Sequence, residues 1–509
     1  MPFLKKAELQ PVKGMNFSLP STYLPEGYHF PQNMQYARGE MTKRHGKSVL
    51  GGVSLGAHQI LHLGIFEQTS GTVKLVRHTK KNVQVYNPVS GIWEDFTGLD
   101  LTGSDTDYYD HAVVAELDMY LFVNKRIDAP RKMLDATNST LLGGSPPKAS
   151  CVEYMTPYVL MGDLEVGGND FPYEIRWCDT GDPETWAGGN AGGVLLSDEP
   201  SSIRRIKKLK SYAMVYKEKS LYRGYQVGSP DIFNFTCLSL GKGLYAPRCV
   251  ADDGNFHYYM GLQDFYLNDG IRSESFGTPV REYIFSRLNR SVNTACHAIH
   301  VEQYKEIWFF IATTGFSLPN EVWKFNYDLN FWYFDTVESS ICSAMYKQTS
   351  FITWDSTPRT WDEQVGNWDK QSGVTDAPLP VFGFDDGFVG KLDENVVDDF
   401  EVAVDSHLDT KDYSGVLAGG LERDTRFLQV DVWARGDSLR LYYSSDYGTT
   451  WNFVSENDLG PTIEKSTFWF DVVAKHIRFR LEQKGLRKKL VIRSLQSYYV
   501  DSGEILQNT

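Results

Sequence analysis

Two segments far apart in this chain share one spacing of aromatic residues and asparagine. In each, an aromatic residue precedes an Asn, and a Trp follows six positions after that Asn: Tyr86, Asn87 and Trp93, then Phe325, Asn326 and Trp332. The spacing predicts a β-hairpin whose Trp packs back into a shared core. The two Asn residues are 239 positions apart, about five periods of 48, and a propeller blade takes ~40–50 residues. We therefore predict a β-propeller in which both Trp residues are structural.

The length and composition agree with many short strands. At 509 residues the chain exceeds a typical single core, so several domains, or a repeat array with an appended domain, are expected. Its 29 Tyr, 29 Phe and 44 Gly favour strands and tight turns over long helices. The predicted fold class is therefore all-β.

Apolar strand patterns separated by turn signals recur through the middle of the chain. Seven candidate blades, with six or eight as alternatives, lie near residues 60–97, 111–130, 151–196, 203–235, 256–270, 306–334 and 341–392. A four-stranded unit is too small to bury its own apolar faces, so neighbouring blades must cover one another and the ring is expected to close. We predict that the propeller spans residues 49–394.

The two ends of the chain differ from this repeat. Residues 1–48 hold five prolines and little alternation, which indicates an extended arm lying on other structure. Beyond an acidic junction at residues 393–401, period-two strands appear at 427–433, 439–443, 476–481 and 490–493. Such alternation is typical of sheets with one buried face. Residues 395–509 are therefore predicted to form a C-terminal β-sandwich.

The charge argues against a protein that reads a nucleic acid sequence. With 51 Lys and Arg against 65 Asp and Glu, the formal net charge is −14, and a surface of this sign repels DNA as a whole. Two basic stretches, residues 204–210 and 484–489, stand out from this background. We interpret both as solvated faces or partners of acidic neighbours.

The six cysteines and the apolar segments bear on the compartment. Cys151, Cys178, Cys237, Cys249, Cys296 and Cys342 include no C-x-x-C pair, which fits thiols in a reducing cytoplasm. The N-terminus lacks the apolar region of a signal peptide, and no run of about 18 apolar residues occurs. We expect neither export by such a signal nor membrane insertion.

One segment fits the S-x-D-x-G-x-x-W pattern of the Asp box, a hairpin turn of sialidases and related propellers. It runs from Ser444 through Asp446 and Gly448 to Trp451. Ser and Asp side chains tie such a turn together, and the Trp packs beneath it, so we interpret the motif as structural. A glycosidase would need two carboxylates facing one sugar, and no pair can be nominated from the sequence.

Two further groups of residues resemble metal sites only superficially. Asp105, Asp107 and Asp110 lack the Gly and the distal Glu of an EF-hand loop, so a polar turn is expected. Cys296 and His297 precede His300, but in a strand His297 and His300 point to opposite faces. No nucleotide-binding, zinc-protease or nucleophile-elbow motif occurs. We predict no catalytic, cofactor-binding or metal-binding residue and no cofactor.

Several motifs, taken in order, resemble the β-propeller tail proteins of double-stranded DNA bacteriophages. The arm carries Asn33, Gly39 and a Lys-Arg-x-Gly motif at residues 43–46, and Asn124 precedes an Asp-x-Pro segment with Lys125 where Gly is usual. Further similar motifs are Asp182-Pro183-x-x-Trp186, residues 265–270, the Trp-Asp pairs at Trp354, Trp361 and Trp368, residues 441–446 and residues 501–504. The resemblance covers nearly the whole chain and is strongest to the nozzle, or packaged-DNA stabilisation, proteins of short-tailed phages.

This resemblance implies a non-enzymatic structural protein of the virion tail, assembled in the host cytoplasm. Such subunits form a ring, commonly a hexamer, as a nozzle below the portal and adaptor or as the hub of a longer tail, and the ring retains packaged DNA and forms the channel for its ejection. The expected partners are further copies of the chain, an adaptor or head-tail connector, tail fibre or spike proteins, and double-stranded DNA in transient, non-specific contact. The alternatives are a sialidase-like, carbohydrate-active propeller and a generic propeller interaction platform.

Overall fold

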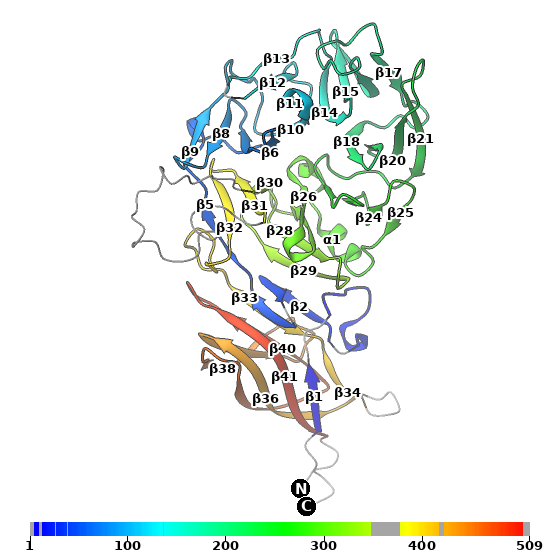
Figure 1. The fold of residues 1–509 in the computed structure, drawn as a ribbon. Coiled ribbons are helices and arrows are strands. Elements are labelled where there is room, and N and C mark those ends of the chain that lie inside the picture. The colour runs from blue at the N-terminus through cyan, green and yellow to red at the C-terminus, as the bar shows by residue number, and fades with distance from the viewer. Residues whose placement is uncertain are drawn as a thin grey trace, which may run out of the picture.

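The structure, a computed structural model, describes residues 5–9, 13–25, 27–37, 39–135, 137–347, 377–416 and 422–501. Figure 1 shows two bodies, a ring of small sheets at the top and a β-sandwich beneath it. Trp354, Trp361 and Trp368 lie outside the described residues.

The ring is a seven-bladed β-propeller, as predicted. Each blade has four antiparallel strands, and the first four blades follow one another in sequence. Blade 1 contains β6 (His62–Glu67), β7 (Val73–His78), β8 (Val83–Asn87) and β9 (Ile92–Asp95), and blade 2 contains β10 (Tyr109–Val114), β11 (Met119–Asn124), β12 (Arg131–Met133) and β13 (Thr140–Leu141). Blade 3 contains β14 (Lys148–Met155), β15 (Tyr158–Val166), β16 (Asn169–Trp177) and β17 (Gly192–Leu195), and blade 4 contains β18 (Ile203–Leu209), β19 (Tyr212–Lys217), β20 (Ser220–Gln226) and β21 (Phe233–Leu240).

The last three blades complete the circle, and the seventh borrows its outer strand from the N-terminal part of the chain. Blade 5 contains β22 (Val250–Asp252), β23 (His257–Met260), β24 (Phe265–Asn268) and β25 (Ser273–Ser275). Blade 6 contains β26 (His297–Val301), β27 (Glu306–Ile311), β28 (Glu321–Asn326) and β29 (Phe331–Thr336). Blade 7 contains β30 (Ser340–Tyr346), β31 (Leu379–Phe384), β32 (Val389–Asp393) and β5 (Gly46–Val49). Among the described residues, the helices are α1 (Arg281–Arg287) and five short 3-10 turns, η1 (Ser21–Tyr23), η2 (Leu55–Ala57), η3 (Ala115–Leu117), η4 (Arg290–Ala295) and η5 (Glu302–Tyr304).

The paired Asn and Trp hairpins occupy equivalent places in blades 1 and 6. Each is the turn between the third and fourth strands, where Tyr86 pairs with Trp93 and Phe325 with Trp332. Asn87 accepts backbone hydrogen bonds within its turn, and Asn326 does the same from Leu329. The spacing in the sequence therefore identified a true structural repeat.

Both Trp side chains lie between blades, as expected. Trp93 belongs to a core cluster shared with blade 7. Trp332 is 1% exposed and packs on Phe265 and Phe276 of blade 5, with ring centroids 4.9 and 5.5 Å away. These contacts bury the apolar faces that single blades cannot bury alone.

The C-terminal body is a β-sandwich, also as predicted. One sheet contains β1 (Lys5–Leu9), β3 (Met34–Ala37), β4 (Glu40–Lys43), β36 (Thr425–Gly436), β39 (Glu464–Ala474) and β41 (Leu490–Asp501). The other contains β33 (Ser406–Thr410), β34 (Tyr413–Val416), β35 (Glu422–Arg423), β37 (Ser438–Ser444), β38 (Asn452–Asp458) and β40 (His476–Gln483). Val430, Leu441, Phe468 and Phe479 lie in the core that the strands of the two sheets share.

Residues 1–48 were expected to form an extended arm lying on other structure, and the described part of this segment consists largely of strands that pair with both domains. Within it, β1, β3 and β4 belong to the sandwich, and β2 (His29–Gln32) joins β29 of blade 6 to β33 of the sandwich. Strand β5 then closes blade 7 by pairing with β32, from Gly46 opposite Asp393 to Val49 opposite Gly390. The N-terminal segment thus belongs structurally to both domains.

Candidate functional site

The N-terminal segment and the linker between the two domains meet in one place, which we call the junction. It contains residues 33–37 and 39–47 of the N-terminal segment, residues 393–405 of the linker and the outer strands of blade 6. Gly46 is required here, because a Cβ at this position would lie 2.0 Å from the Asp398 carbonyl oxygen. Close backbone contact therefore fixes the path of the chain through the junction.

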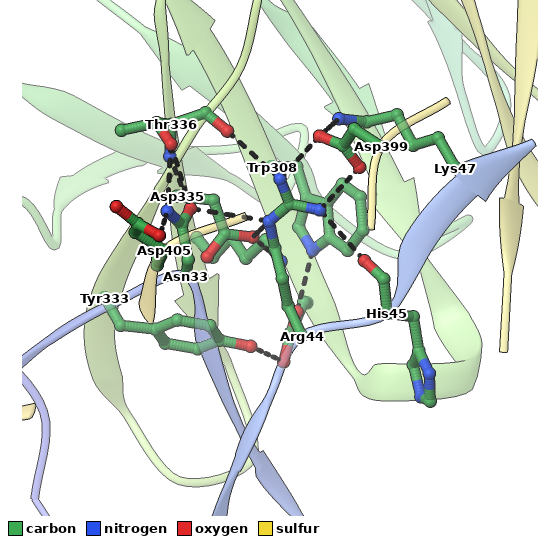
Figure 2. A network of polar contacts seen from close by, with 12 residues as sticks. Asn33, Arg44, His45, Lys47, Trp308, Tyr333, Asp335, Thr336, Asp399 and Asp405 are labelled. Atoms are coloured by element: carbon green, nitrogen blue, oxygen red, sulfur yellow. Dashed lines mark hydrogen bonds and ion pairs between the residues drawn. The ribbon is translucent and has the colours of Figure 1, made fainter. Parts of the chain in front are cut away.

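Arg44 is the centre of the junction (Figure 2). Its Nη1 donates to Asp399 Oδ1 at 2.9 Å and its Nη2 to Asp399 Oδ2 at 2.6 Å. It also donates to the His45 carbonyl oxygen at 2.9 Å. The Arg44 side chain is 5% exposed, and a two-pronged pair of this kind holds both groups in a defined orientation.

Asp399 serves a second cation as well. Lys47 Nζ donates to Asp399 Oδ2 at 2.8 Å. Burial opposes ionisation of Asp399, but the charges of Lys47 and Arg44 outweigh it and hold the pKa of the carboxyl well below its usual range. Two cations from the propeller-closing segment are therefore tied to one linker carboxylate.

Asn33 links blade 6 to the linker by its side-chain amide. Its Oδ1 accepts from the Thr336 backbone N–H at 2.8 Å, and its Nδ2 donates to the Asp405 carbonyl oxygen at 2.7 Å. Asn33 has φ 55°, a left-handed conformation that Asn tolerates better than most residues. The arm motif Asn33 and Lys-Arg-x-Gly thus acts as a clamp between the domains.

The charged network continues into blade 6. Asp335 lies near Arg44 and forms an ion pair with Lys324, whose Nζ stands 4.0 Å from the Trp308 ring centroid. Trp308 donates to the buried Glu306, which also accepts from the Tyr333 hydroxyl. Lys43 completes the set with Asp398 at 3.8 Å. Four cations therefore balance four carboxylates, and such buried networks are maintained by mutual pairing.

A cavity of about 550 Å³ opens beside this network, and we call it the junction pocket. Its floor is formed by the Arg44, Lys47 and Asp399 group, and its walls come from β5, from the turn between β31 and β32 and from the linker. Within the described chain, the junction is a structural centre with a pocket attached to it.

The propeller axis is filled by side chains where the inner strands begin. Arg248, which precedes β22 of blade 5, donates to the Leu61 carbonyl oxygen of blade 1 at 2.6 Å and to that of Thr294 at 2.7 Å. Blades 5 and 1 are not neighbours, so this contact crosses the axis. Arg205 of blade 4 likewise reaches Asp110 of blade 2 at 3.0 Å.

Histidines add to this axial cluster. His62 Nε2 and His111 Nδ1 are 2.8 Å apart, and burial lowers the pKa of His111 to about 3. Where the inner strands end, at the opposite mouth, a cavity of about 780 Å³ is lined by Lys207, Asp252 and His300 among others. The axis is therefore closed at one end and hollow at the other.

Replacing Arg248 with alanine should lower the free energy of unfolding by about 2–4 kcal/mol. The reason is that two carbonyl groups, one buried (Leu61) and one partly buried (Thr294), would lose their donor, at about 1–3 kcal/mol for a buried group. Denaturant titration of the purified variant would measure the loss. A variant as stable as the parent would show that the guanidinium does not hold the blades together across the axis.

The three aspartates considered for calcium do not converge on one point. Asp105 contacts Lys80, Asp107 accepts from Ser104 in its own turn, and Asp110 is buried in the axial cluster with Arg205. His297 is buried and stacks on Phe310, whereas His300 faces the other way and contacts the Tyr327 hydroxyl at 3.2 Å. Among the described residues no group of three or more His, Cys, Asp or Glu is arranged to hold a metal ion.

The Asp box forms the turn between β37 and β38 of the sandwich. Ser444 Oγ donates to Asp446 Oδ1 at 2.7 Å, and Asp446 accepts from Thr450 through both its backbone N–H and its hydroxyl. These bonds lower the pKa of Asp446 to about 2. The Arg480 guanidinium lies 4.1 Å from the Trp451 ring centroid. Its residues are engaged in holding the turn, as the structural interpretation expects.

The basic stretches have acidic neighbours, as interpreted. The first includes the inner strand of blade 4, where Arg204 contacts Glu218 and Arg205 contacts Asp110. The second is the turn between β40 and β41, where Lys484 contacts Glu482 and Lys488 contacts Asp437. No helix in the described part of the chain is long and apolar enough to cross a bilayer.

Sequence reasoning missed the junction as a site. The basic cluster at residues 43–47 and the acidic cluster at 393–401 were both visible, but nothing local pairs one with the other. The available signal was that these two clusters carry opposite charge and lie on either side of the repeated segments, which would have suggested that they pair.

Comparison with known proteins does not show which family the chain belongs to. No protein-family model and no curated protein sequence matches the chain. Among solved structures, it is similar to the WD40 domain of Pan2 from Neurospora crassa, with a TM-score of 0.40 and 7% identity over 69% of this chain and 96% of that one. The propeller is established by the order of its own strands.

Proposed function

We propose that this protein is a non-enzymatic structural component of a phage tail, assembled as a ring of identical subunits that retains and later conducts packaged DNA. One observation carries the proposal: the motif Asn33 with residues 43–46, which belongs to the resemblance, forms the clamp between a closed propeller and a C-terminal sandwich. Arm, propeller and sandwich follow one another in the order that the resemblance implies.

The physical properties of the chain support a load-bearing role. Blade 6 continues through β2 into the sandwich as one hydrogen-bonded sheet of 11 strands, so the two domains resist separation. The net charge of −14 discourages DNA from adhering to the surface. Because Arg248 and its neighbours fill the propeller axis, a DNA channel would be formed between subunits and not within one.

The test is electron microscopy of purified tailed particles with the protein labelled at its N-terminus. We expect several copies arranged symmetrically around the tail axis below the portal, most simply six. Loss of the protein should give particles that package DNA but fail to keep it. A single copy in intact tails, or absence of the protein from the particle, would refute the proposal, and hydrolysis of a glycan by the purified protein would point to an enzyme instead.

A further inference from the structure

We propose that the junction pocket binds a protein segment that combines lysine or arginine with aliphatic residues. This site is distinct from the proposed DNA channel, and its argument does not depend on the proposed function. It rests on the charge of the pocket rim, on the apolar character of its walls and on the strained turn beside it.

The rim of the pocket is acidic and lacks counterions. Four carboxylates line the cavity: Glu338, Asp385, Asp386 and Asp405. In the described part of the chain none of them lies within ion-pair distance of a Lys, Arg or His, whereas the linker carboxylates Asp398 and Asp399 are paired with Lys43, Arg44 and Lys47. Asp386 only accepts a backbone hydrogen bond from Phe388 within its turn, at 3.0 Å. The rim therefore carries an uncompensated negative charge.

The floor does not neutralise this rim. Arg44 and Lys47 are the cations that line the pocket, and both are bound to Asp399 at its base. Their charges are thus already matched inside the network described above. A ligand that enters the pocket meets net negative charge, so the pocket selects cations.

The walls of the pocket are apolar, so they favour a ligand that carries apolar groups as well as positive charge. Val49 from β5, Phe384 and Phe388 from the β31–β32 hairpin, and Phe400 and Val402 from the linker all line the pocket. Val49 is 47% and Val402 is 61% exposed. Lys and Arg carry long apolar stems beneath their charged heads, and neighbouring aliphatic residues would cover the two valines. This favours a peptide segment over a small polyamine.

A strained turn forms one wall of the pocket. Phe400 and Glu401 both adopt left-handed backbone, with φ 50° and 66°, between Asp399 and Val402, which pair through two backbone hydrogen bonds. Such two-residue turns normally take Asn-Gly or Asp-Gly. The Phe400 ring is held edge-on against Phe384 at 5.2 Å. The strain maintains a defined wall, and backbone strain of this kind is concentrated at binding sites.

The volume fits this class of ligand. Pockets that bind small molecules or anchor side chains measure about 300–1,000 Å³, and the junction pocket has about 550 Å³. The junction pocket can therefore accept one or two side chains of a peptide segment that binds where the propeller meets the sandwich.

The experiment uses the full chain and a fluorescein-labelled hexapeptide that alternates leucine and arginine. We expect saturable binding by fluorescence anisotropy that weakens as salt is raised from about 50 to about 300 mM, because screening acts on exposed charges. The triple variant D385N/D386N/E338Q should weaken binding about tenfold or more. Ala403→Trp, which places a bulky ring at the pocket mouth without changing charge, should weaken it comparably.

The matched control is the triple variant D100N/D231N/E282Q. It removes the same charge from exposed positions that do not line the pocket, and it should bind the peptide within about twofold of the parent. Melting temperatures of all variants verify that they are folded. Equal weakening by both triple variants would overturn the proposal in favour of general charge attraction. So would displacement of the peptide by spermidine as readily as by unlabelled peptide, unchanged binding by Ala403→Trp, or the absence of saturable binding.

Discussion

Replacing Trp332 with alanine is expected to lower the free energy of unfolding by about 3–5 kcal/mol, the usual cost of deleting a large aromatic side chain from a core. The indole is 1% exposed and lies among Phe265, Phe276, Phe309 and Phe325, so its removal leaves a cavity between blades 5 and 6. Rigid neighbours on both sides prevent the site from collapsing. Chemical denaturation monitored by circular dichroism would measure the change.

Three other substitutions separate cavity formation from other effects. Trp93→Ala should fall in the same range, because Trp93 also packs between blades and donates to the Leu50 carbonyl oxygen at 3.0 Å. Trp332→Phe should cost less, since the Trp332 N–H has no partner in the described chain. Trp469→Ala, at a 71% exposed position, should have little effect. Unchanged melting of both alanine variants at the blade interfaces would remove these Trp residues from the core.

Replacing Asp399 with alanine is expected to cost about 3–5 kcal/mol, because it leaves two buried cations without their shared counterion. Arg44 and Lys47 are 5% and 8% exposed, and neither can turn to solvent without disturbing the strand that closes blade 7. Lys47→Met should cost less, since Arg44 would keep both bonds to Asp399. Calorimetric unfolding of the two variants would compare these losses. Equal stability of Asp399→Ala and the parent would show that the clamp contributes nothing.

The same carboxylate predicts a pH dependence. The pKa of Asp399 is lower in the folded protein than in the unfolded chain, where it is about 3.9. Its contribution to stability is therefore fully present above about pH 4 and is lost as the pH falls toward the folded pKa. The difference in stability between the parent and Asp399→Asn should shrink as the pH is lowered from about 6 to about 2. A difference that stays constant over this range would contradict the ionic role of Asp399.

Much of the propeller could be predicted because its signals are local. The Asn and Trp of each outer hairpin are six positions apart, and hydrogen bonds within each turn, such as that from Leu329 to Asn326, hold them in place. The Asp box is likewise complete within eight residues, and its Ser444 to Asp446 bond forms wherever the turn forms. Strand alternation between such turns was sufficient to count seven blades.

The junction could not be predicted because its contacts join distant parts of the chain. Arg44 and Asp399 are 355 positions apart, and Asn33 and Thr336 are 303 apart. Prolines in residues 1–48 indicated an extended segment, but a strand that pairs only with remote partners has no local signature. The acidic residues at 393–401 could be recognised in the sequence, but the cations that they pair with could be identified only from the tertiary structure.

By itself, then, the amino-acid sequence determined an all-β chain, the seven blade units and the position of the sandwich, because periodicity and turn chemistry act between near neighbours. Only the tertiary structure decided that Gly46–Val49 closes the ring, that β2 unites blade 6 with the sandwich and that Asp399 serves both Arg44 and Lys47. Those arrangements depend on which surfaces meet after the chain has folded. The acidic pocket between the two domains exists only as a result of that meeting.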